Sequence, residues 1–467
     1  MEEPISRHVK VGVKPVFVRL VHSAAYEGPC RVGSPEDLDP EREKEKAKKA
    51  FERFVQDLRS NVGEDALLLD PVLLTWTDRW QIPERELEKL DQDLSDTDLF
   101  LVSGGLAQYP AIAIAKRYGK PVAMVGSVVT VDVAAHLRAR GMEGYAPMNF
   151  DELSRLTRLM MVRKAISKMR ILVVLEGDLI PVGVASTIWD LQDLEDRFGV
   201  GHVTVPSSLL FDVMEDLSEE ESRRAERMAD ALMEGAEEVH MERSNILPSV
   251  RFYLAARKVM KSYGCNALSI PCFEVCAKQI AQKSRVTFCL THSLLKDEGI
   301  PSACEGDINV LMAMALLMYL SGKSAYMGNS YPVDEEHNIL AVHHDVPGLR
   351  MKGLDGPILP YEVRNFTHAG WGATIRYDFS RDVGQPVTLA RFDPRATRLL
   401  VAEGRIAGGG GLDEIGCSLR AHVQVRDLVE LFRAEADFGH HLAMVYGRYA
   451  SEVKELGRMM GFDVVQV

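Results

Sequence analysis

Two carboxylates, Glu305 and Asp307, stand directly before the very apolar run VLMAMALLMYL at 310–320. The run is too short to span a membrane and predicts a helix buried on all sides. Asp307 is well placed as its N-cap and Glu305 lies just outside the first turn, where exposed amides and the positive helix end keep carboxylates ionised. Such a carboxylate can bind a hard divalent cation. The alternative is that Asp307 is only a cap and Glu305 only a surface loop residue.

Two histidine pairs come from other segments. His343-His344 ends an expected strand, and His440-His441 opens what the pattern predicts as the last helix, HLAMVYGRYASEVKELGRMMG. A lone pair is more often a satisfied polar group than a ligand. One acidic segment and two histidine pairs, each beside an apolar element, nevertheless fit a site assembled at a domain junction.

The elements that must position these residues fall into three parts. Residues 1–167 alternate strand, glycine turn, helix and strand, which is the pattern of a parallel doubly wound sheet. Residues 168–325 restart it, with a charged helix at 218–235 and a late strand at 285–290. Residues 326–467 hold short β-rich runs and then return to helix. The predicted fold class is α/β: two doubly wound, flavodoxin-like domains and a β-rich, barrel-like C-terminal domain with terminal helices.

The composition is that of an ordinary globular protein. A length of 467 residues predicts roughly three domains of about 150 residues. A net charge of −13 without a basic stripe argues against nucleic acid or an anionic membrane as the main partner. The seven cysteines do not suggest a disulfide framework. Because no apolar signal segment or membrane-spanning run is visible, we expect a cytoplasmic protein.

The run CEGD, the apolar helix, LSGK, a short aromatic loop and a strand ending in His resemble the metal-binding region of the L-fucose and L-arabinose isomerase superfamily. GQPVTLARFD, VAEGRI, GCSLRAHVQV and FGHHLAMVYG follow in the order of that family's last domain. These motifs occupy residues 303–347 and 384–447, and the two preceding α/β units match the family's domain plan. The resemblance implies a metal-dependent aldose–ketose isomerase acting on a free sugar. It also implies a homo-oligomer, trimeric or hexameric, in which the first domain of one subunit closes a neighbour's site.

The resemblance further implies a ligand set. Family members use a divalent cation, usually Mn²⁺ and otherwise one such as Co²⁺ or Mg²⁺, held by two carboxylates and a histidine, with a further histidine near the C-terminus. Glu305, in the central domain, matches the first carboxylate and would be both ligand and acid/base. His344 matches the histidine ligand. His441, or its neighbour His440, matches the late histidine as a ligand or substrate contact.

The second carboxylate is where this sequence departs from the family. In the loop YMGNS the aligned residue is Asn329 or Gly328. An asparagine amide can coordinate a cation through oxygen, but it carries no charge and cannot act as a base. The acidic residues Asp334, Glu335 and Glu336 could substitute if the loop folds back, although a solvated acidic turn is the other interpretation of that triplet.

The departure bears on the chemistry. Aldose–ketose isomerisation moves a proton between C1 and C2 through an ene-diol, which needs a base and an acid, while the cation bridges O1 and O2. Two alternatives therefore stay open. The same fold could run a different carbohydrate reaction, such as C–C bond transfer or cleavage, which Asn329 favours. The chain could also be a non-catalytic sugar-binding protein, which predicts that it binds no metal.

Overall fold

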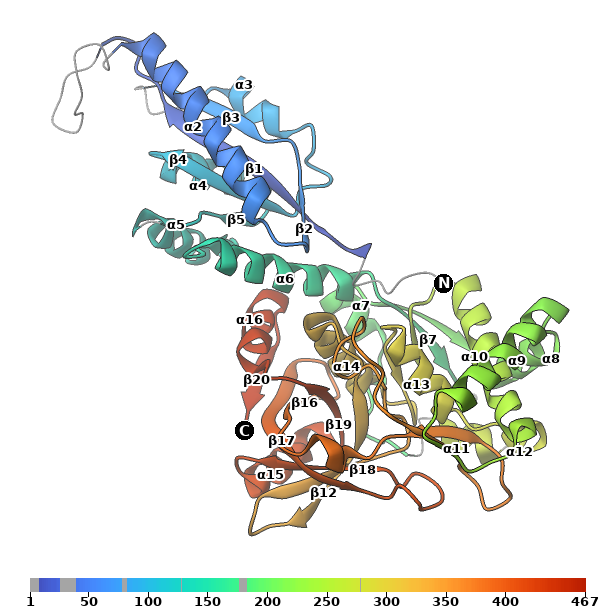
Figure 1. Cartoon of the computed structure of the whole chain (residues 1–467). Helices are drawn as coiled ribbons and strands as arrows, with labels where there is room; N and C mark the ends of the chain where they lie inside the picture. The colour runs from blue at the N-terminus through green and yellow to red at the C-terminus, as the bar shows by residue number, and fades with distance from the viewer. Residues whose placement is uncertain (1–7, 26–38, 78–81, 127, 176–182, 278) are drawn as a thin grey trace. The chain divides into compact units, whose positions relative to one another are not determined.

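The computed structural model describes residues 8–25, 39–77, 82–126, 128–175, 183–277 and 279–467 (Figure 1). These residues form two compact units: the first is Val9–Met161, and the second is Val162–Val467 together with His8. Among them, no helix has the length and apolar character needed to cross a membrane.

The first unit is built on one parallel sheet, in which the described strands follow the order β2-β1-β4-β5-β6 and β3 pairs with β1. The strands are β1 (Val11–Leu20), β2 (Ala66–Leu68), β3 (Val72–Trp76), β4 (Leu99–Gly105), β5 (Val122–Ala123) and β6 (Gly144–Tyr145). The helices are α2 (Pro40–Asn61), α3 (Glu84–Leu87), η2 (Glu88–Leu90), α4 (Gln108–Tyr118), α5 (Val128–Arg138) and α6 (Phe150–Ser167), which runs on into the second unit. The sheet order confirms the doubly wound parallel arrangement.

The second unit begins with another parallel sheet, of order β11-β10-β7-β8. Its described strands are β7 (Arg170–Val174), β8 (Gly201–Val205), β10 (Ala267–Ser269) and β11 (Ser302–Ala303). The helices around it are α7 (Gln192–Phe198), α8 (Ser207–Glu215), α9 (Glu219–Glu234), α10 (Arg243–Ser262), α11 (Cys272–Ala277), α12 (Ile280–Ser284), α13 (Cys289–Asp297) and α14 (Ile308–Ser321).

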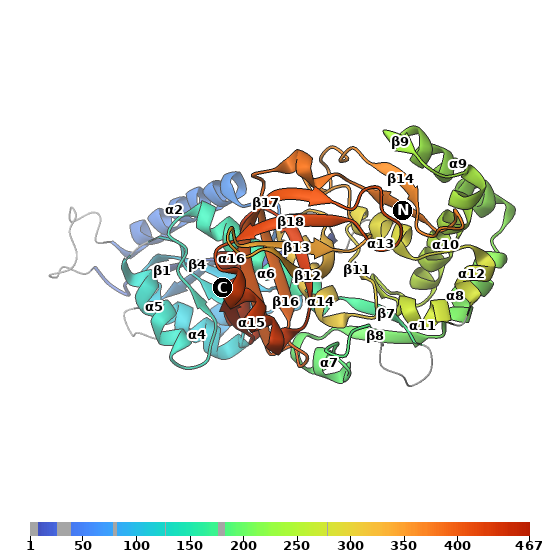
Figure 2. The same cartoon turned by 90° about the horizontal axis from the view of Figure 1, so that it is seen from below.

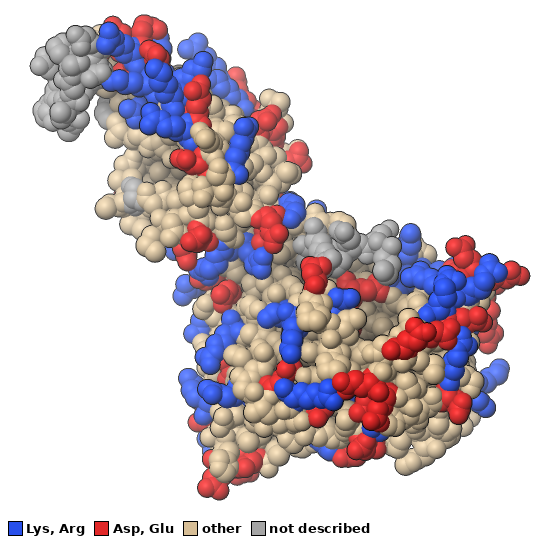
Figure 3. All heavy atoms as spheres, in the orientation of Figure 1, with Lys and Arg blue, Asp and Glu red and all other residues tan. Residues whose placement is uncertain are grey.

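Of two elements predicted in this part of the chain, the structure confirms one and contradicts the other. The charged helix at 218–235 is confirmed as α9, which Ser218 starts with a capping box to Glu221. The strand expected at 285–290 is wrong, because Arg285 adopts a left-handed backbone and α13 begins at Cys289. On α9, as on α2, acidic and basic side chains lie interspersed on the face shown in Figure 3, so these are solvated surface helices.

A closed antiparallel barrel follows, with strands β12, β13, β18, β17, β16 and β19 paired in a ring. They span β12 (Tyr326–Asp334), β13 (Ile339–His343), β16 (Pro386–Phe392), β17 (Arg398–Gly410), β18 (Arg420–Val425) and β19 (His441–Tyr446). The other elements are β9 (Glu238–Val239), β14 (Glu362–Asn365), β15 (Ala373–Arg376), η3 (Phe379–Asp382), α15 (Leu428–Phe438), α16 (Ala450–Met460) and β20 (Asp463–Gln466). The β-rich barrel with terminal helices is therefore confirmed (Figure 2).

The segment that the sequence predicts as the start of the last helix is instead a barrel strand. HLAMVY forms β19, which lies between β16 and β12, and every one of its residues is buried. The outer face of β19 packs against α14. A strand covered on both faces is apolar at successive positions, so its hydrophobic pattern cannot be told from that of a buried helix. His441 thus opens a strand, and helix begins again at Ala450.

The central sheet and the barrel share one hydrophobic core. Buried side chains from β7, β10 and α10 form one cluster with the inner side chains of the barrel, such as Tyr326, Leu389 and Met444. Residues Ile308–Leu320 of α14 are all buried, which confirms the helix expected from the apolar run. The domain boundaries at 167 and 325 remain predictions.

Candidate active site

Glu305 lies in the tight turn that joins β11 to α14. Its backbone is left-handed, with φ of 58°, and Gly306 follows with φ of 70°. A non-glycine residue in this region is strained, and such strain is often found at functional sites. The turn leaves Glu305 6% exposed, two residues before Asp307, the N-cap of a buried helix.

Histidines from two other segments meet this carboxylate. His344, directly after β13, places Nε2 3.2 Å from Glu305 Oε1. His441, the first residue of β19, places Nε2 3.6 Å from Glu305 Oε2. Donor atoms of Glu305, His440 and His441 all lie within 4.8 Å of one another. Residues from three separate segments are therefore brought together around Glu305.

Asp307 does more than cap α14. Its side chain accepts a hydrogen bond from the backbone N–H of Val310 at 3.1 Å, and it also pairs with Arg391 and with His441 Nδ1. Arg391, on β16, is fully buried and donates to the carbonyl oxygens of Phe438 and His441. The buried charge of each partner is thus compensated, and the ion pair fixes the start of β19 against the start of α14.

The electrostatics keep both carboxyl groups ionised. Burial alone would raise the pKa of Asp307, but the Arg391 guanidinium and His441 hold this pKa well below its ordinary value. Burial likewise opposes ionisation of Glu305, yet the hydrogen bond from His344 and the nearby His441 and His440 lower its pKa. Burial lowers the pKa of His440 to about 4, so that this imidazole is neutral at pH 7. Ionised carboxylates and a neutral imidazole are the states in which these groups bind metals.

Asn329 lies on β12 and not in the loop expected from the sequence. It stands opposite His343 on one side and His441 on the other in the strand register. Because residues paired directly across antiparallel strands point to the same face, Asn329 shares a face with His441. Its Nδ2 donates to the carbonyl oxygen of His343 at 3.3 Å.

The acidic triplet after Asn329 lies elsewhere. Asp334 ends β12, and its carboxylate binds His337 within the β12–β13 turn at 2.8 Å. Glu335 and Glu336 are exposed in the same turn. The separation from Asn329 to Asp334 is about 16 Å along a strand at about 3.3 Å per residue. The structure therefore does not bring the triplet to Glu305.

Two residues at the site were missed by the sequence interpretation. Arg391 stands in the apolar strand PVTLARF, and an arginine in such a run is a signal of a buried ion pair. Gly183 is the second: a Cβ at this position would lie 2.6 Å from Glu305 Oε2 and 2.9 Å from the ring of Phe273. Nothing in the local sequence around Gly183 indicates this approach.

A second group that could hold a cation lies on the three-stranded sheet. It contains Glu238, His240 and Glu362, of which the first two are exposed. Arg364 already pairs with Glu362 at 2.6 Å. Since the guanidinium competes for the same oxygen, the Glu305 group is the better candidate.

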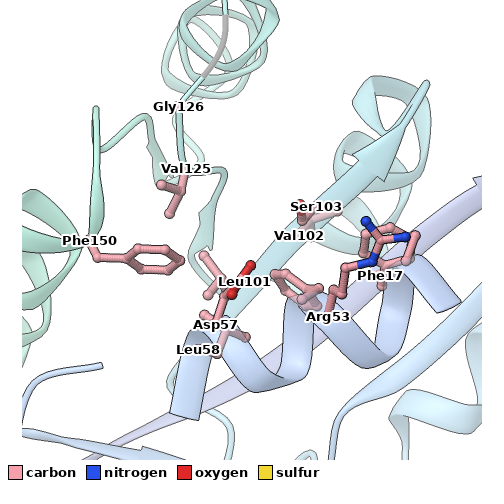
Figure 4. Close-up of a pocket in the computed structure, with 12 residues that line it drawn as sticks. Phe17, Arg53, Asp57, Leu58, Leu101, Val102, Ser103, Val125, Gly126 and Phe150 are labelled. Atoms are coloured by element: carbon pink, nitrogen blue, oxygen red, sulfur yellow. The ribbon is translucent and has the colours of Figure 1, made fainter. Parts of the chain in front are cut away.

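The first unit contains a cavity of about 470 Å³ on the α2 side of its sheet (Figure 4). Aromatic side chains of β1, α2 and α6 line it together with Arg53, Asp57 and Ser103. Arg53 and Asp57 are both exposed to solvent, and this lining has no histidine or cysteine. The cavity therefore lacks the donor chemistry found around Glu305.

The chain is similar to sulfoquinovose isomerases. It is 27% identical over 334 residues to the enzyme of Alkalicoccus urumqiensis, a match that covers 68% of this chain and 69% of that protein. It is 26% identical over 325 residues to the enzyme of Priestia aryabhattai, which covers 67% and 68% of the two chains. A shorter match, 26% identical over 153 residues, relates it to the enzyme of Clostridium sp. (strain MSTE9). No family model matches the sequence.

Proposed function

We propose that this chain is an aldose–ketose isomerase, an intramolecular oxidoreductase that acts on a free sugar with the help of a divalent cation. The observation that carries the proposal is the meeting of Glu305 with His344, His440 and His441 from three segments. The similarity to proteins named sulfoquinovose isomerases supports the same reaction class.

The residues around Glu305 fit a divalent cation. His441 Nε2 is fully buried without a hydrogen-bond partner among the described residues, and it faces the ionised carboxylate. A buried polar atom without a hydrogen-bond partner needs an explanation, and a role as a metal ligand would explain this nitrogen. When bound, the cation would polarise the sugar carbonyl and stabilise negative charge on the neighbouring oxygen. Mn²⁺, or a cation such as Co²⁺ or Mg²⁺, is the proposed species.

Glu305 is the proposed base that moves the proton between C1 and C2. It is ionised, nearly buried, and held from two sides by imidazoles. His344 Nε2 lies beside the same carboxylate, where an N–H could protonate a sugar oxygen. Asn329 can bind a sugar hydroxyl through its amide oxygen but cannot take the proton itself.

The sugar is proposed from the relatives. Because they are named sulfoquinovose isomerases, sulfoquinovose is the first substrate to test, with glucose as the unsulfonated control. A homo-oligomer, trimeric or hexameric, is part of the same proposal, and light scattering on the purified protein measures its mass.

The test is ketose formation followed by NMR with the purified chain, with and without Mn²⁺. The proposal expects conversion that stops when a chelator removes the cation and that Glu305→Gln abolishes. Normal turnover in Glu305→Gln would rule out the assigned base. A product with a different number of carbons would favour the bond-cleaving alternative. A folded chain that gains no thermal stability with Mn²⁺ and converts no sugar would favour a sugar-binding protein.

A further inference from the structure

The two histidines that touch Glu305 are held in opposite tautomers. The Asp307 carboxylate can only accept a hydrogen bond, so His441 must carry its proton on Nδ1, 2.9 Å from Asp307 Oδ2. In the neutral imidazole the lone pair is then on Nε2, which faces Glu305 at 3.6 Å. A carboxylate behind one ring nitrogen and a free lone pair on the other is the usual arrangement of a metal-binding histidine.

His344 is arranged the other way round. The backbone N–H of Asp345 donates to His344 Nδ1 at 3.0 Å, so this nitrogen must present its lone pair. In a neutral imidazole the proton is then on Nε2, from which it is donated to Glu305 Oε1 at 3.2 Å. The Sγ atom of Cys417 also lies on the Nδ1 side, at 3.9 Å. With its Nδ1 used as an acceptor, His344 has no lone pair on Nε2 to offer a cation.

His440 is the neighbour that can complete the donor set. Gly439, with φ of 107°, turns the chain just before it, and the rings of His440 and His441 lie 4.4 Å apart between centroids. His440 precedes the first residue of β19, so the alternation of side chains in a regular strand does not apply to it, and the two consecutive rings can lie side by side. His440 stands within 4.8 Å of the donor atoms of Glu305 and His441.

We propose that the cation binds between Glu305, His440 and His441, and that His344 is a hydrogen-bond donor to Glu305 and not a ligand. The inference rests on the proposed function only in taking the cation to serve the isomerase. In this ligand set the His440 imidazole takes the role of the second carboxylate, because this chain has Asn329 at the position of that carboxylate. A donor set with two imidazoles would favour metals that bind imidazole well. Co²⁺ should therefore bind more tightly than Mn²⁺, and both more tightly than Mg²⁺.

The test is Co²⁺ binding to the full chain without sugar, measured by calorimetry and by the visible absorption of the bound ion. Binding should weaken at least tenfold in His440→Ala and in His441→Ala. It should stay within about threefold of the wild type in His344→Gln, because the glutamine amide can still donate to Glu305. His343→Gln is the matched control, since this half-buried histidine of the same pair is not assigned to the site.

Three results would overturn the assignment: binding lost in a folded His344→Gln, binding retained in His440→Ala, or no binding of Co²⁺ to the wild type. If His344→Gln does not fold, X-ray absorption at the cobalt edge tests the ligand set with the wild type and His440→Ala. It should count two imidazoles in the wild type and one in His440→Ala, and three in the wild type would contradict the proposal. Because no sugar is present, a failure of the isomerase assay alone leaves these results intact, and the two proposals fail separately.

Discussion

Asp307 Oδ2 lies 2.9 Å from His441 Nδ1, and the same carboxylate pairs with the fully buried Arg391. The helix cap, the barrel strand β16 and the first residue of β19 are thus joined at one side chain. This relationship orients the His441 ring toward Glu305. Asp307 is therefore a positioning residue, which acts on the site through His441.

Asp307→Asn should weaken Co²⁺ binding by about 10- to 100-fold, because the amide no longer fixes the His441 tautomer. It should also lower the free energy of unfolding by about 3–5 kcal/mol, since Arg391 is left as an uncompensated buried charge. Cation titration and urea unfolding measure the two effects. Asp345→Asn is the matched control: it breaks the equally buried pair with Arg376 while keeping the Asp345 backbone N–H. Equal cation affinity in both variants would contradict the positioning role.

Gly183→Ala should reduce kcat/KM roughly 10- to 100-fold with little change in Tm. The new Cβ would lie 2.6 Å from Glu305 Oε2, so the carboxylate must move away from its present position. Gly201→Ala is the control, because its Cβ would meet only Arg170 Cγ at an ordinary 3.6 Å. Wild-type kinetics in Gly183→Ala would mean that the position of this carboxylate does not limit the reaction.

Glu435, on α15, predicts a pH dependence of stability. Burial raises its pKa to about 7, against the smaller opposing effects of Ser330 and Arg391. The unfolded chain ionises this carboxyl near its ordinary pKa of about 4.3, so between that value and about 7 the folded state holds a proton that the unfolded state has lost. Stability contributed by the protonated group is complete below about pH 4 and is lost as pH rises through 7.

Glu435→Gln should therefore exceed the wild type in unfolding free energy by up to about 3 kcal/mol at pH 8, and by much less at pH 5. Denaturant titrations at the two pH values measure the difference. Glu430→Gln, on the exposed face of the same helix, should leave the pH dependence unchanged. A constant difference between Glu435→Gln and the wild type at both pH values would contradict the raised pKa.

Removal of the cation should lower the thermal stability of the wild type. A ligand at 100 times its Kd stabilises the folded state by about 2.7 kcal/mol, and thermal scans with a chelator and with added Co²⁺ measure the shift. Glu305→Gln should show a much smaller shift, because the variant loses the charged ligand. An equal shift in the two proteins would place the cation elsewhere.

Local sequence predicts the elements that carry the candidate site. The N-cap Asp307 and the buried helix α14 follow from a short motif and an apolar run, and the structure has both. The parallel sheets and the barrel follow from alternating elements and turn residues in the same way.

Local sequence does not predict the features that depend on tertiary contacts. HLAMVY is apolar at successive positions because α14 covers one face of β19 and the barrel interior the other, so its pattern predicts a helix where the structure has a strand. The sequence predicts a loop at Asn329, but its register with His343 and His441 makes it part of a strand. The pair of Asp307 and Arg391 joins residues 84 positions apart, which no local pattern indicates.

The central claim is that Glu305 moves a proton between C1 and C2 of a sugar. The most direct measurement is deuterium incorporation from D₂O, followed by NMR with sulfoquinovose, the cation and the purified chain. The account predicts label at C1 of the ketose or C2 of the aldose with no change in carbon count, and a rate at least 100-fold lower in Glu305→Gln. Incorporation at the wild-type rate in a folded Glu305→Gln would contradict it.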